Sequence, residues 1–169
     1  MELPLLATDR LTLRPQREDD LPALLEIIRT PSVALWWVNT DDDVFLRDDL
    51  RHDGNAMTIE IDGAVAGWLG VYEENAPDFR YASLDIALAP NHQDKGLGPH
   101  ALRTIIRWLI DEGGHHRITI DPSVDNTRAI AAYEAVGFRP VGVMRQHWRD
   151  AAGVWRDDLL MDLLAGELR

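Results

Sequence analysis

A glycine-rich segment, Gln93–Gly98, has the residue types that hold a phosphate group. The apolar run Ser83–Leu88 precedes it, and the helical pattern Ala101–Ile110 follows it. In a strand, loop and helix of this kind, glycines let the backbone approach an anion, and free N–H groups of the helix start face it. The segment has neither the Lys-Ser/Thr ending of a P-loop nor the three-glycine spacing of a dinucleotide site. The sequence therefore predicts a phosphate-binding loop of another class.

Two acidic residues are predicted near this loop. Asp85 lies inside the apolar run, where a carboxylate is unusual unless it is paired or functional. We expect Asp85 to bind an ammonium group and to act as a base, directly or through water; a solvent-facing carboxylate on an alternating strand is the alternative. Asp121 ends the next predicted strand, where it either contacts a substrate amine or forms an Asx turn before Pro122.

Two adjacent tryptophans, Trp36 and Trp37, offer a platform for a cyclic or cationic substrate, with ordinary packing of a short helix as the alternative. The six histidines show no metal-ligand spacing. The absence of cysteine excludes disulfides, thiolate metal sites and a cysteine nucleophile. We therefore expect no metal.

Composition narrows the class of protein. A chain of 169 residues with 46% hydrophobic and 27% charged residues is typical of a globular protein, and we expect one domain over residues 1–169. The net charge of −12 argues against a nucleic-acid partner and favours cations. Neither a membrane span nor a signal peptide is recognisable, so we expect no membrane partner and a cytoplasmic location.

The hydrophobic pattern predicts the elements that position these residues. We expect strands at residues 11–15, 56–61, 64–72, 81–89, 117–120, 138–148 and 154–161, and helices at residues 20–29, 41–50, from the glycine loop to 111, and 126–136. Asp62-Gly63 between two strands predicts a hairpin. The order of elements predicts an α/β protein with a mixed sheet covered by helices. A ligand site is expected at the turn after the central strand.

At this point the sequence resembles the GNAT acetyltransferase superfamily over essentially the whole chain. Gln93, Gly96 and Gly98 match the loop that binds the pyrophosphate of acetyl-CoA, and residues 125–138 match the second family block, Asn…Ala…Tyr-Glu…Gly-Phe. The resemblance implies an α/β, GNAT-like fold. Its central, mostly antiparallel sheet contains a splayed parallel pair and is flanked by about four helices. It also implies acetyl-CoA as co-substrate.

The resemblance also assigns roles to individual residues. It implies a cofactor site formed by Ile86, Ala87, Leu88, Gln93, Asp94, Lys95, Gly96, Leu97, Gly98, Asn126, Ala129 and Tyr133. Backbone groups of residues 86–88 would pair with the pantetheine arm, with the Leu88 N–H as a candidate oxyanion donor. Asn126 would bind the same arm and Tyr133 would protonate the thiolate; a core aromatic is the alternative for Tyr133. Pro99 departs from an ideal loop because it has no N–H.

A closer resemblance points to an acceptor. Residues 120–130 resemble a segment of bacterial aminoglycoside 6'-N-acetyltransferases, which are antibiotic-resistance enzymes. We therefore expect direct acetyl transfer to a 6'-amine, with Asp85 and Tyr133 catalytic and with Trp36, Trp37, Asp85 and Asp121 binding the substrate. The alternatives are a protein N-terminus, a polyamine or a siderophore amine as acceptor, or a non-catalytic acyl-CoA-binding module. The expected partner is a small cationic amine, and the expected assembly is a monomer or homodimer.

Overall fold

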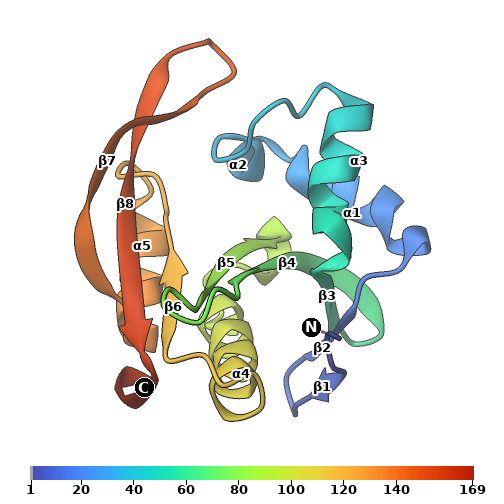
Figure 1. Cartoon of the computed structure of the whole chain (residues 1–169). Helices are drawn as coiled ribbons and strands as arrows, with labels where there is room; N and C mark the ends of the chain where they lie inside the picture. The colour runs from blue at the N-terminus through green and yellow to red at the C-terminus, as the bar shows by residue number, and fades with distance from the viewer. Residues whose placement is uncertain (1) are drawn as a thin grey trace. The chain divides into compact units, whose positions relative to one another are not determined.

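The computed structural model describes residues 2–169, apart from the side chain of Asp53. Its strands form a mixed sheet in the order β1-β2-β3-β4-β5-β6-β8-β7 (Figure 1). The strands are β1 (Leu6–Ala7), β2 (Thr12–Pro15), β3 (Ala56–Ile61), β4 (Ala64–Glu74), β5 (Tyr81–Leu88), β6 (Arg117–Ile120), β7 (Arg139–Arg149) and β8 (Trp155–Leu164). The α-helices are α1 (Leu21–Ile28), α2 (Pro31–Ala34), α3 (Asp43–Arg51), α4 (Leu97–Asp111) and α5 (Thr127–Val136).

The described backbone divides into two compact units. Unit 1 contains the residues up to Val71 together with Asp85–Ala101, and unit 2 contains Tyr72–Leu84 and Leu102–Arg169. The boundary passes through β4, β5 and α4, so these three elements contribute to both units. Among the described residues, no helix has both the length and the apolar character needed to cross a membrane.

The predicted fold class is confirmed. The sheet is mostly antiparallel, and its parallel pair is β5 with β6, in which Ala82 faces Ile118 and Ser83 faces Thr119. The described residues contain five α-helices where about four were expected, because Pro31 starts an additional single turn, α2. The predicted Asp-Gly hairpin joins β3 to β4.

The hairpin turn has the backbone that its sequence favours. Asp62 and Gly63 have φ of 52° and 77°, which are the left-handed values of a type I′ turn. Close by, Gly67 of β4 is needed for a different reason. A Cβ there would come within 2.4 Å of the Ala87 carbonyl oxygen, so only glycine permits this approach of β4 to β5.

Helices α1 and α3 lie side by side in unit 1 and cover an apolar core (Figure 1). Leu24 of α1 and Leu46 and Leu50 of α3 are fully buried there. The Trp68 indole fills the space beside them, and its Nε1 donates a hydrogen bond to the Leu50 carbonyl oxygen at 2.7 Å. This core fixes the helices that follow β2.

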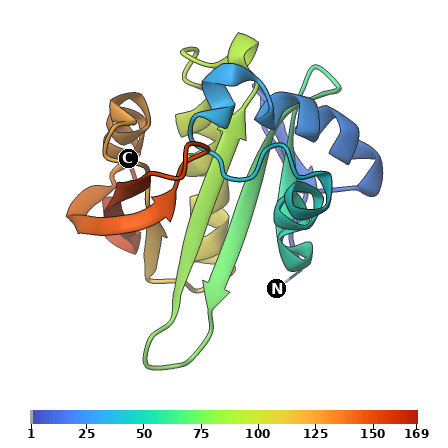
Figure 2. The same ribbon diagram turned by 90° about the horizontal axis from the view of Figure 1, so that it is seen from above.

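In unit 2, the ends of β4 and β5 are joined by a loop at residues 75–80 that projects beyond the strands (Figure 2). The Arg80 guanidinium donates to the Gly113 carbonyl oxygen at 2.6 Å and so ties the loop to the end of α4. His115 is buried next to Glu73, with Nε2 and Oε1 2.6 Å apart. Strand β8 lies between β6 and β7 and pairs antiparallel with both.

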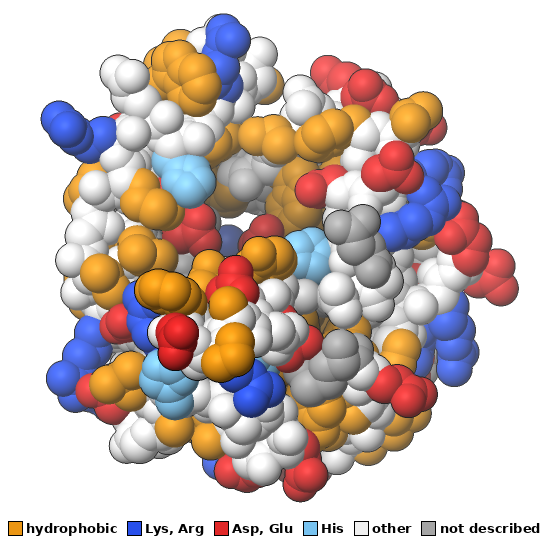
Figure 3. All heavy atoms as spheres, viewed as in Figure 1, with side chains coloured by type: hydrophobic (Ala, Val, Ile, Leu, Met, Phe, Trp, Pro, Cys, Tyr) orange, Lys and Arg blue, Asp and Glu red, His pale blue; other side chains and the backbone are white. Residues whose placement is uncertain are grey.

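Acidic and basic side chains are interspersed on the face shown in Figure 3. Unit 1 contains surface ion pairs: Arg29 pairs with Asp43, and Arg51 pairs with Glu18 and Asp48. The excess of acidic residues therefore does not form one continuous acidic surface on this face.

The start of α1 differs from the expectation. The sequence pattern predicts a helix from Asp20 with Asp19 as its cap. Instead a 3-10 turn, η1 (Glu18–Asp20), precedes α1, and Asp20 is buried with 5% of its surface exposed. Its carboxylate faces inward because it binds Arg14.

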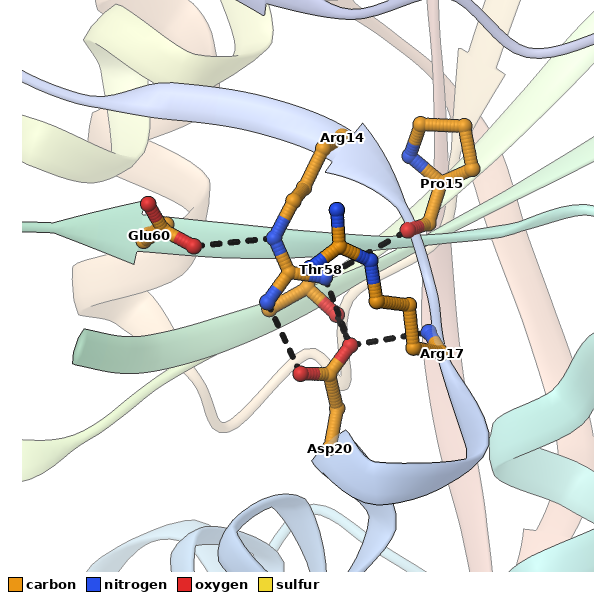
Figure 4. A network of polar contacts seen from close by, with 6 residues as sticks. All are labelled: Arg14, Pro15, Arg17, Asp20, Thr58 and Glu60. Atoms are coloured by element: carbon orange, nitrogen blue, oxygen red, sulfur yellow. Dashed lines mark hydrogen bonds and ion pairs between the residues drawn. The ribbon is translucent and has the colours of Figure 1, made fainter. Parts of the chain in front are cut away.

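Arg14 of β2 holds this region together through a buried polar network (Figure 4). Its two terminal nitrogens donate to both Asp20 oxygens at 2.7 and 2.8 Å, and its Nε donates to Glu60 at 2.8 Å. The Thr58 hydroxyl and the Arg17 backbone N–H also donate to Asp20, both at 2.8 Å. The network joins β2, η1 and β3.

The network controls the charge state of Asp20. Burial alone would raise the pKa of this carboxyl, but the hydrogen bonds from Arg14, Arg17 and Thr58 and the charge of Arg14 lower its pKa to about 2. The hydrogen bonds to Asp20 and Glu60 and the negative charges of these two residues raise the pKa of the Arg14 guanidinium above its ordinary value, although burial opposes the shift. Both groups are therefore charged at neutral pH.

Replacing Asp20 by Asn should destabilise the protein by about 3 kcal/mol at pH 7, because the buried Arg14 loses its principal counter-charge. Urea denaturation measures this loss. Since the folded pKa is depressed, the stabilisation by the Asp20 charge is complete above pH 4 and is lost as the pH falls toward 2. The difference between Asp20→Asn and the wild type should therefore shrink in that interval. The control Glu18→Gln, at a surface ion pair, should change stability little; equal losses for the two variants would contradict the prediction.

Candidate functional site

The glycine loop follows β5 in unit 1, after the 3-10 turn η3 (Pro90–His92). Asp94 and Gly96 have φ of 58° and 72°, so both take the left-handed conformation and curl the backbone. The Gln93 side chain donates from Nε2 to the Leu88 carbonyl oxygen at 2.8 Å, which fastens the loop to the end of β5. Gln93 therefore has a structural contact inside the loop that the motif alone did not predict.

The turn between β1 and β2 contacts the same loop. Arg10 donates from Nη2 to the Lys95 carbonyl oxygen at 2.7 Å, and Thr8 Oγ1 lies 3.0 Å from His100 Nε2. The exposed Arg10 guanidinium thus brings a positive charge to the loop in addition to Lys95. Sequence reasoning missed Arg10 because the contact joins residues far apart in the chain and no local pattern marks it.

The first turn of α4 offers few backbone donors. Leu97 and Gly98 are its first two residues, whose N–H groups have no acceptor within a helix. Pro99 has no N–H, and the His100 N–H donates to the Gly96 carbonyl oxygen at 3.1 Å. The expected shortage at Pro99 is therefore present, and the donors left at the helix start are those of Leu97 and Gly98.

Gly96 and Gly98 have different structural reasons for being glycine. Gly96 needs its left-handed φ of 72°. Gly98 is helical, and a Cβ on it would meet nothing nearer than Leu88 Cδ1 at 3.5 Å, an ordinary contact. Neither the backbone nor the packing of this chain requires glycine at position 98, whereas close approach of an external group would.

Asp85 is an exposed residue of β5. Ala82 and Leu84 are buried before it and Ala87 after it, so strict alternation along the strand fails at this point. Asp85 Oδ1 accepts a hydrogen bond from the Ile86 N–H at 2.8 Å. The Ile86 N–H, expected to pair with a cofactor, is therefore engaged with its neighbour.

The two tryptophans expected to form a platform have unequal surroundings. The Trp37 Nε1 donates to Asp49 at 2.9 Å, and its ring meets the Trp68 ring edge-on at 5.4 Å between centroids. These contacts are those of a packed side chain. Trp36 is partly exposed on the turn that follows α2, so it is better placed than Trp37 to meet a ligand.

In unit 2, α5 carries three predicted cofactor residues. Asn126 caps the helix, and its Oδ1 accepts from the Ala129 N–H at 3.2 Å. Tyr133 lies two turns further along the same face, is 9% exposed, and its ring is tilted against Phe138 at 6.1 Å. Helix capping by Asn126 and packing of Tyr133 on Phe138 are therefore structural roles that these positions have apart from cofactor binding. Asp85 and the loop lie in unit 1.

Asp121 also lies in unit 2, and two residues that sequence reasoning missed lie beside it. His147 of β7 and Asp158 of β8 join Asp121 in a group whose ligand atoms all lie within 4.8 Å of one another. Asp158 is 7% exposed, and its Oδ1 accepts from Trp148 Nε1 at 2.8 Å. No local sequence pattern marks these two residues, because the register of β7 on β8, which is irregular between Met144 and Trp148, decides which side chains meet.

The environment shifts both carboxyl groups in the same direction. Burial raises the pKa of Asp121, although the charge of His147 opposes it. Burial also raises the pKa of Asp158 to about 6; His147 and the Trp148 hydrogen bond oppose this shift, and the negative charges of Asp121 and Asp157 add to it. The surroundings of both carboxyl groups thus disfavour their charged forms.

The strand, glycine loop and helix, with the second block on α5, define a class of protein. The model of the acetyltransferase (GNAT) family matches residues 21–138, and the chain belongs to this family.

Three similar proteins illustrate what such chains do. The aminoglycoside N(6')-acetyltransferase type 1 of Klebsiella pneumoniae is 28% identical over 161 residues, covering 82% of this chain and 78% of that protein. The N-alpha-acetyltransferase RimI of Mycobacterium tuberculosis is 31% identical over 88 residues, about half of each chain (52% and 53%). The structure of the Vibrio cholerae spermidine N-acetyltransferase with CoA and spermine has a TM-score of 0.76, with 21% identity and coverage of 95% of this chain and 98% of that one.

Replacing Asp158 by Asn should stabilise the protein at pH 7.5 by up to about 3 kcal/mol, because a buried charge with a raised pKa is removed. The sign follows from the raised folded pKa: the wild type loses stability as the pH rises from about 4 to about 6, whereas the Asn variant does not. Urea denaturation at pH 3.5 and pH 7.5 measures the effect, which should nearly vanish at the lower pH. Asp78→Asn, at an exposed loop position, removes the same charge and should change stability little. A destabilised Asp158→Asn at pH 7.5 would contradict the prediction.

Proposed function

We propose that the chain transfers an acetyl group from acetyl-CoA to a primary amine of a small polycation, with the 6'-amine of an aminoglycoside as the first choice. The observation that carries the proposal is the Gly98 position at the start of a helix, where a Cβ would meet only an ordinary contact and the packing of the chain does not require glycine. A pyrophosphate is the kind of group that such a helix start accepts. The Klebsiella relative, matched over most of its length, supports the aminoglycoside as acceptor.

Each unit contains residues that we assign to acetyl-CoA binding. In unit 1, the loop from Gln93 to Gly98 would surround the pyrophosphate, with N–H groups from Leu97 and Gly98 and positive charge from Lys95 and Arg10. The backbone of residues 86–88 would bind the pantetheine arm, which requires the Ile86 N–H to exchange its Asp85 partner for the cofactor. In unit 2, Asn126 and Ala129 would bind the same arm from the start of α5. Acetyl-CoA supplies the acetyl thioester; the remaining chemistry belongs to the chain.

The chain has to move two protons and stabilise one oxyanion. Asp85 is exposed and would take the proton of the acceptor ammonium, directly or through water. The Leu88 N–H would donate to the oxyanion that forms when the amine attacks. Tyr133 would return a proton to the leaving thiolate. Holding both substrates in one complex makes the attack effectively unimolecular.

A polyamine acceptor is the second candidate. The resemblance to a spermidine N-acetyltransferase and the raised pKa values at Asp121 and Asp158 favour a substrate that brings several positive charges. A protein N-terminus is favoured only by the RimI match, which covers about half of each chain. A monomer or homodimer that acts in the cytoplasm on small amines, without nucleic acid, membrane or metal, remains the prediction.

The test of the reaction is CoA release over a panel of aminoglycosides, polyamines and peptides. We expect turnover with polycations, and we expect Asp85→Asn and Tyr133→Phe to lower kcat about 100-fold or more, since each removes a proton-transfer group. Circular dichroism and thermal melting control for folding. Unchanged turnover in both variants, or release with peptides alone, would overturn the assignment.

The loop can be tested separately with two matched glycine substitutions. Gly98→Ala should leave the fold intact and add up to about 1 kcal/mol of stability, because Ala is the better helix former. It should raise KM for acetyl-CoA about tenfold, because the methyl group occupies the space that the pyrophosphate needs. Gly96→Ala should instead cost about 1–2 kcal/mol of stability because of its left-handed φ. An unchanged KM in Gly98→Ala would remove the loop from the cofactor site.

A further inference from the structure

We propose that Arg10, on the turn between β1 and β2, binds the pyrophosphate of acetyl-CoA and supplies a hydrogen-bond donor that the glycine loop lacks. The proposal rests on the proposed function and adds a residue to its cofactor site. Arg10 lies outside residues 21–138, which the family model matches, so the family match assigns it no role. Arg10 and the loop both belong to unit 1.

The Arg10 guanidinium lies against the loop at a defined position. Its Nη2 donates to the Lys95 carbonyl oxygen at 2.7 Å, and its Nη1 is 3.8 Å from the place that a Cβ on Gly96 would take. A guanidinium has several N–H donors, and among the described residues the Arg10 side chain makes this one hydrogen bond. The other donors of the exposed side chain are therefore available to an anion at the loop.

The loop is short of backbone donors for an anion. The N–H groups of the first three residues of a helix have no acceptor within it, and Pro99 occupies the third of these positions in α4 without an N–H. The His100 N–H, which follows, already donates to the Gly96 carbonyl oxygen at 3.1 Å. A guanidinium offers paired N–H groups and a positive charge, an arrangement that fits the oxygens of a phosphate. Arg10 therefore compensates for the donor that is missing at Pro99.

The turn that carries Arg10 is fixed by a second contact with the same helix start. The Thr8 hydroxyl donates to the Leu11 carbonyl oxygen at 2.8 Å and accepts from the Arg10 backbone N–H at 3.2 Å. Because the hydroxyl proton is already used, His100 Nε2, which lies 3.0 Å from Thr8 Oγ1, has to be the donor in that contact. The pairing of β1 with β2 holds both ends of the turn. Arg10 is thus held at the loop through its backbone as well as its guanidinium.

Equilibrium binding measures the role of Arg10 without turnover. Isothermal titration with CoA, in the absence of an acceptor, should give a Kd about tenfold higher or more for Arg10→Ala than for the wild type, because a charge-assisted contact is lost. Arg10→Lys keeps the charge but not the paired N–H groups, and should raise the Kd about threefold. The control Arg17→Ala removes another exposed arginine side chain of unit 1 and should change the Kd less than about twofold. Thermal melting controls for folding.

Dephospho-CoA identifies the group that Arg10 contacts. It lacks the 3'-phosphate of CoA but retains the pyrophosphate, so Arg10→Ala should weaken its binding by the same factor as the binding of CoA. A loss of affinity that is seen with CoA and disappears with dephospho-CoA would assign Arg10 to the 3'-phosphate and overturn the proposal.

Restoring the missing backbone donor tests the compensation. Pro99→Ala gives the helix start an N–H that has no acceptor within the helix. In the Arg10→Ala background this substitution should recover most of the affinity, to within about threefold of the wild-type Kd, whereas with Arg10 present it should change the Kd little. A loop that had only lost its shape with Arg10 would not be repaired by a new N–H. Equal Kd values for Arg10→Ala and the double variant would therefore contradict the proposal.

Lys95 is the only lysine of the chain, so its ε-amine reports on occupancy of the loop. CoA should slow the acylation of Lys95 by an N-hydroxysuccinimide ester, measured by peptide mass spectrometry. Arg10→Ala should require about tenfold more CoA for the same protection, since the bound fraction follows the Kd. Protection at the wild-type CoA concentration in Arg10→Ala would count against the proposal.

The outcomes separate the role of Arg10 from the proposed function. Wild-type affinity for CoA in Arg10→Ala, in a protein that acetylates amines, would overturn the role of Arg10 and leave acetyl transfer in place. A loss of CoA affinity in Arg10→Ala that Pro99→Ala restores, in a protein that acetylates no amine, would support the role of Arg10 and refute the proposed function.

Discussion

The buried ion pair between Arg14 and Asp20 is the constraint on which unit 1 depends. Taking both charges from water costs free energy that only close, multiple hydrogen bonds offset. The chain provides them from β2, η1 and β3, so the three segments have to adopt one arrangement before the pair is stable. The start of α1, and with it the apolar core under α1 and α3, follows from that arrangement.

The two buried aspartates, Asp20 and Asp158, have opposite shifts in pKa, although both are the same type of residue. Asp20 is saturated with donors, and its pKa is lowered to about 2, which is typical of a carboxylate that stabilises a fold. Within the described residues, Asp158 accepts one hydrogen bond, from Trp148, and its pKa is raised to about 6. A group left in an unfavourable charge state costs stability, and such groups concentrate at sites that bind or react.

Local patterns predicted most of the fold, because they report on local causes. Asp62-Gly63 favours one turn, and the periodic apolar positions of α3 and α5 indicate which helix face is buried. The glycine loop was predictable for the same reason, because its residues are adjacent in sequence and a regular strand and a regular helix flank it. The buried Asp20 escaped prediction because its partner is on another strand, and a charged residue beside a helix start is read more simply as a cap.

The candidate site was also predictable only in part, because some of its residues meet through contacts between segments that are far apart in the sequence. Asp85, Asp121 and Tyr133 stand out by type and position, whereas His147 and Asp158 meet only through the irregular register of β7 on β8. Such contacts depend on the position of the register shift between the two strands. No short motif in a single sequence indicates that position. Trp37 is the opposite case. It was predicted to bind substrate because of its residue type, but its ring packs against Trp68 and its Nε1 donates to Asp49.

The bond from Arg10 to the Lys95 carbonyl oxygen has a thermodynamic consequence for the loop. A flexible glycine-rich segment loses conformational entropy when it closes on a ligand, and that loss subtracts from the affinity. Here the turn between β1 and β2 and the Gln93 side chain restrain the loop backbone at two points through contacts within the chain. Part of the ordering therefore takes place during folding, so the sequence of a distant turn helps to determine how tightly the loop binds its anion.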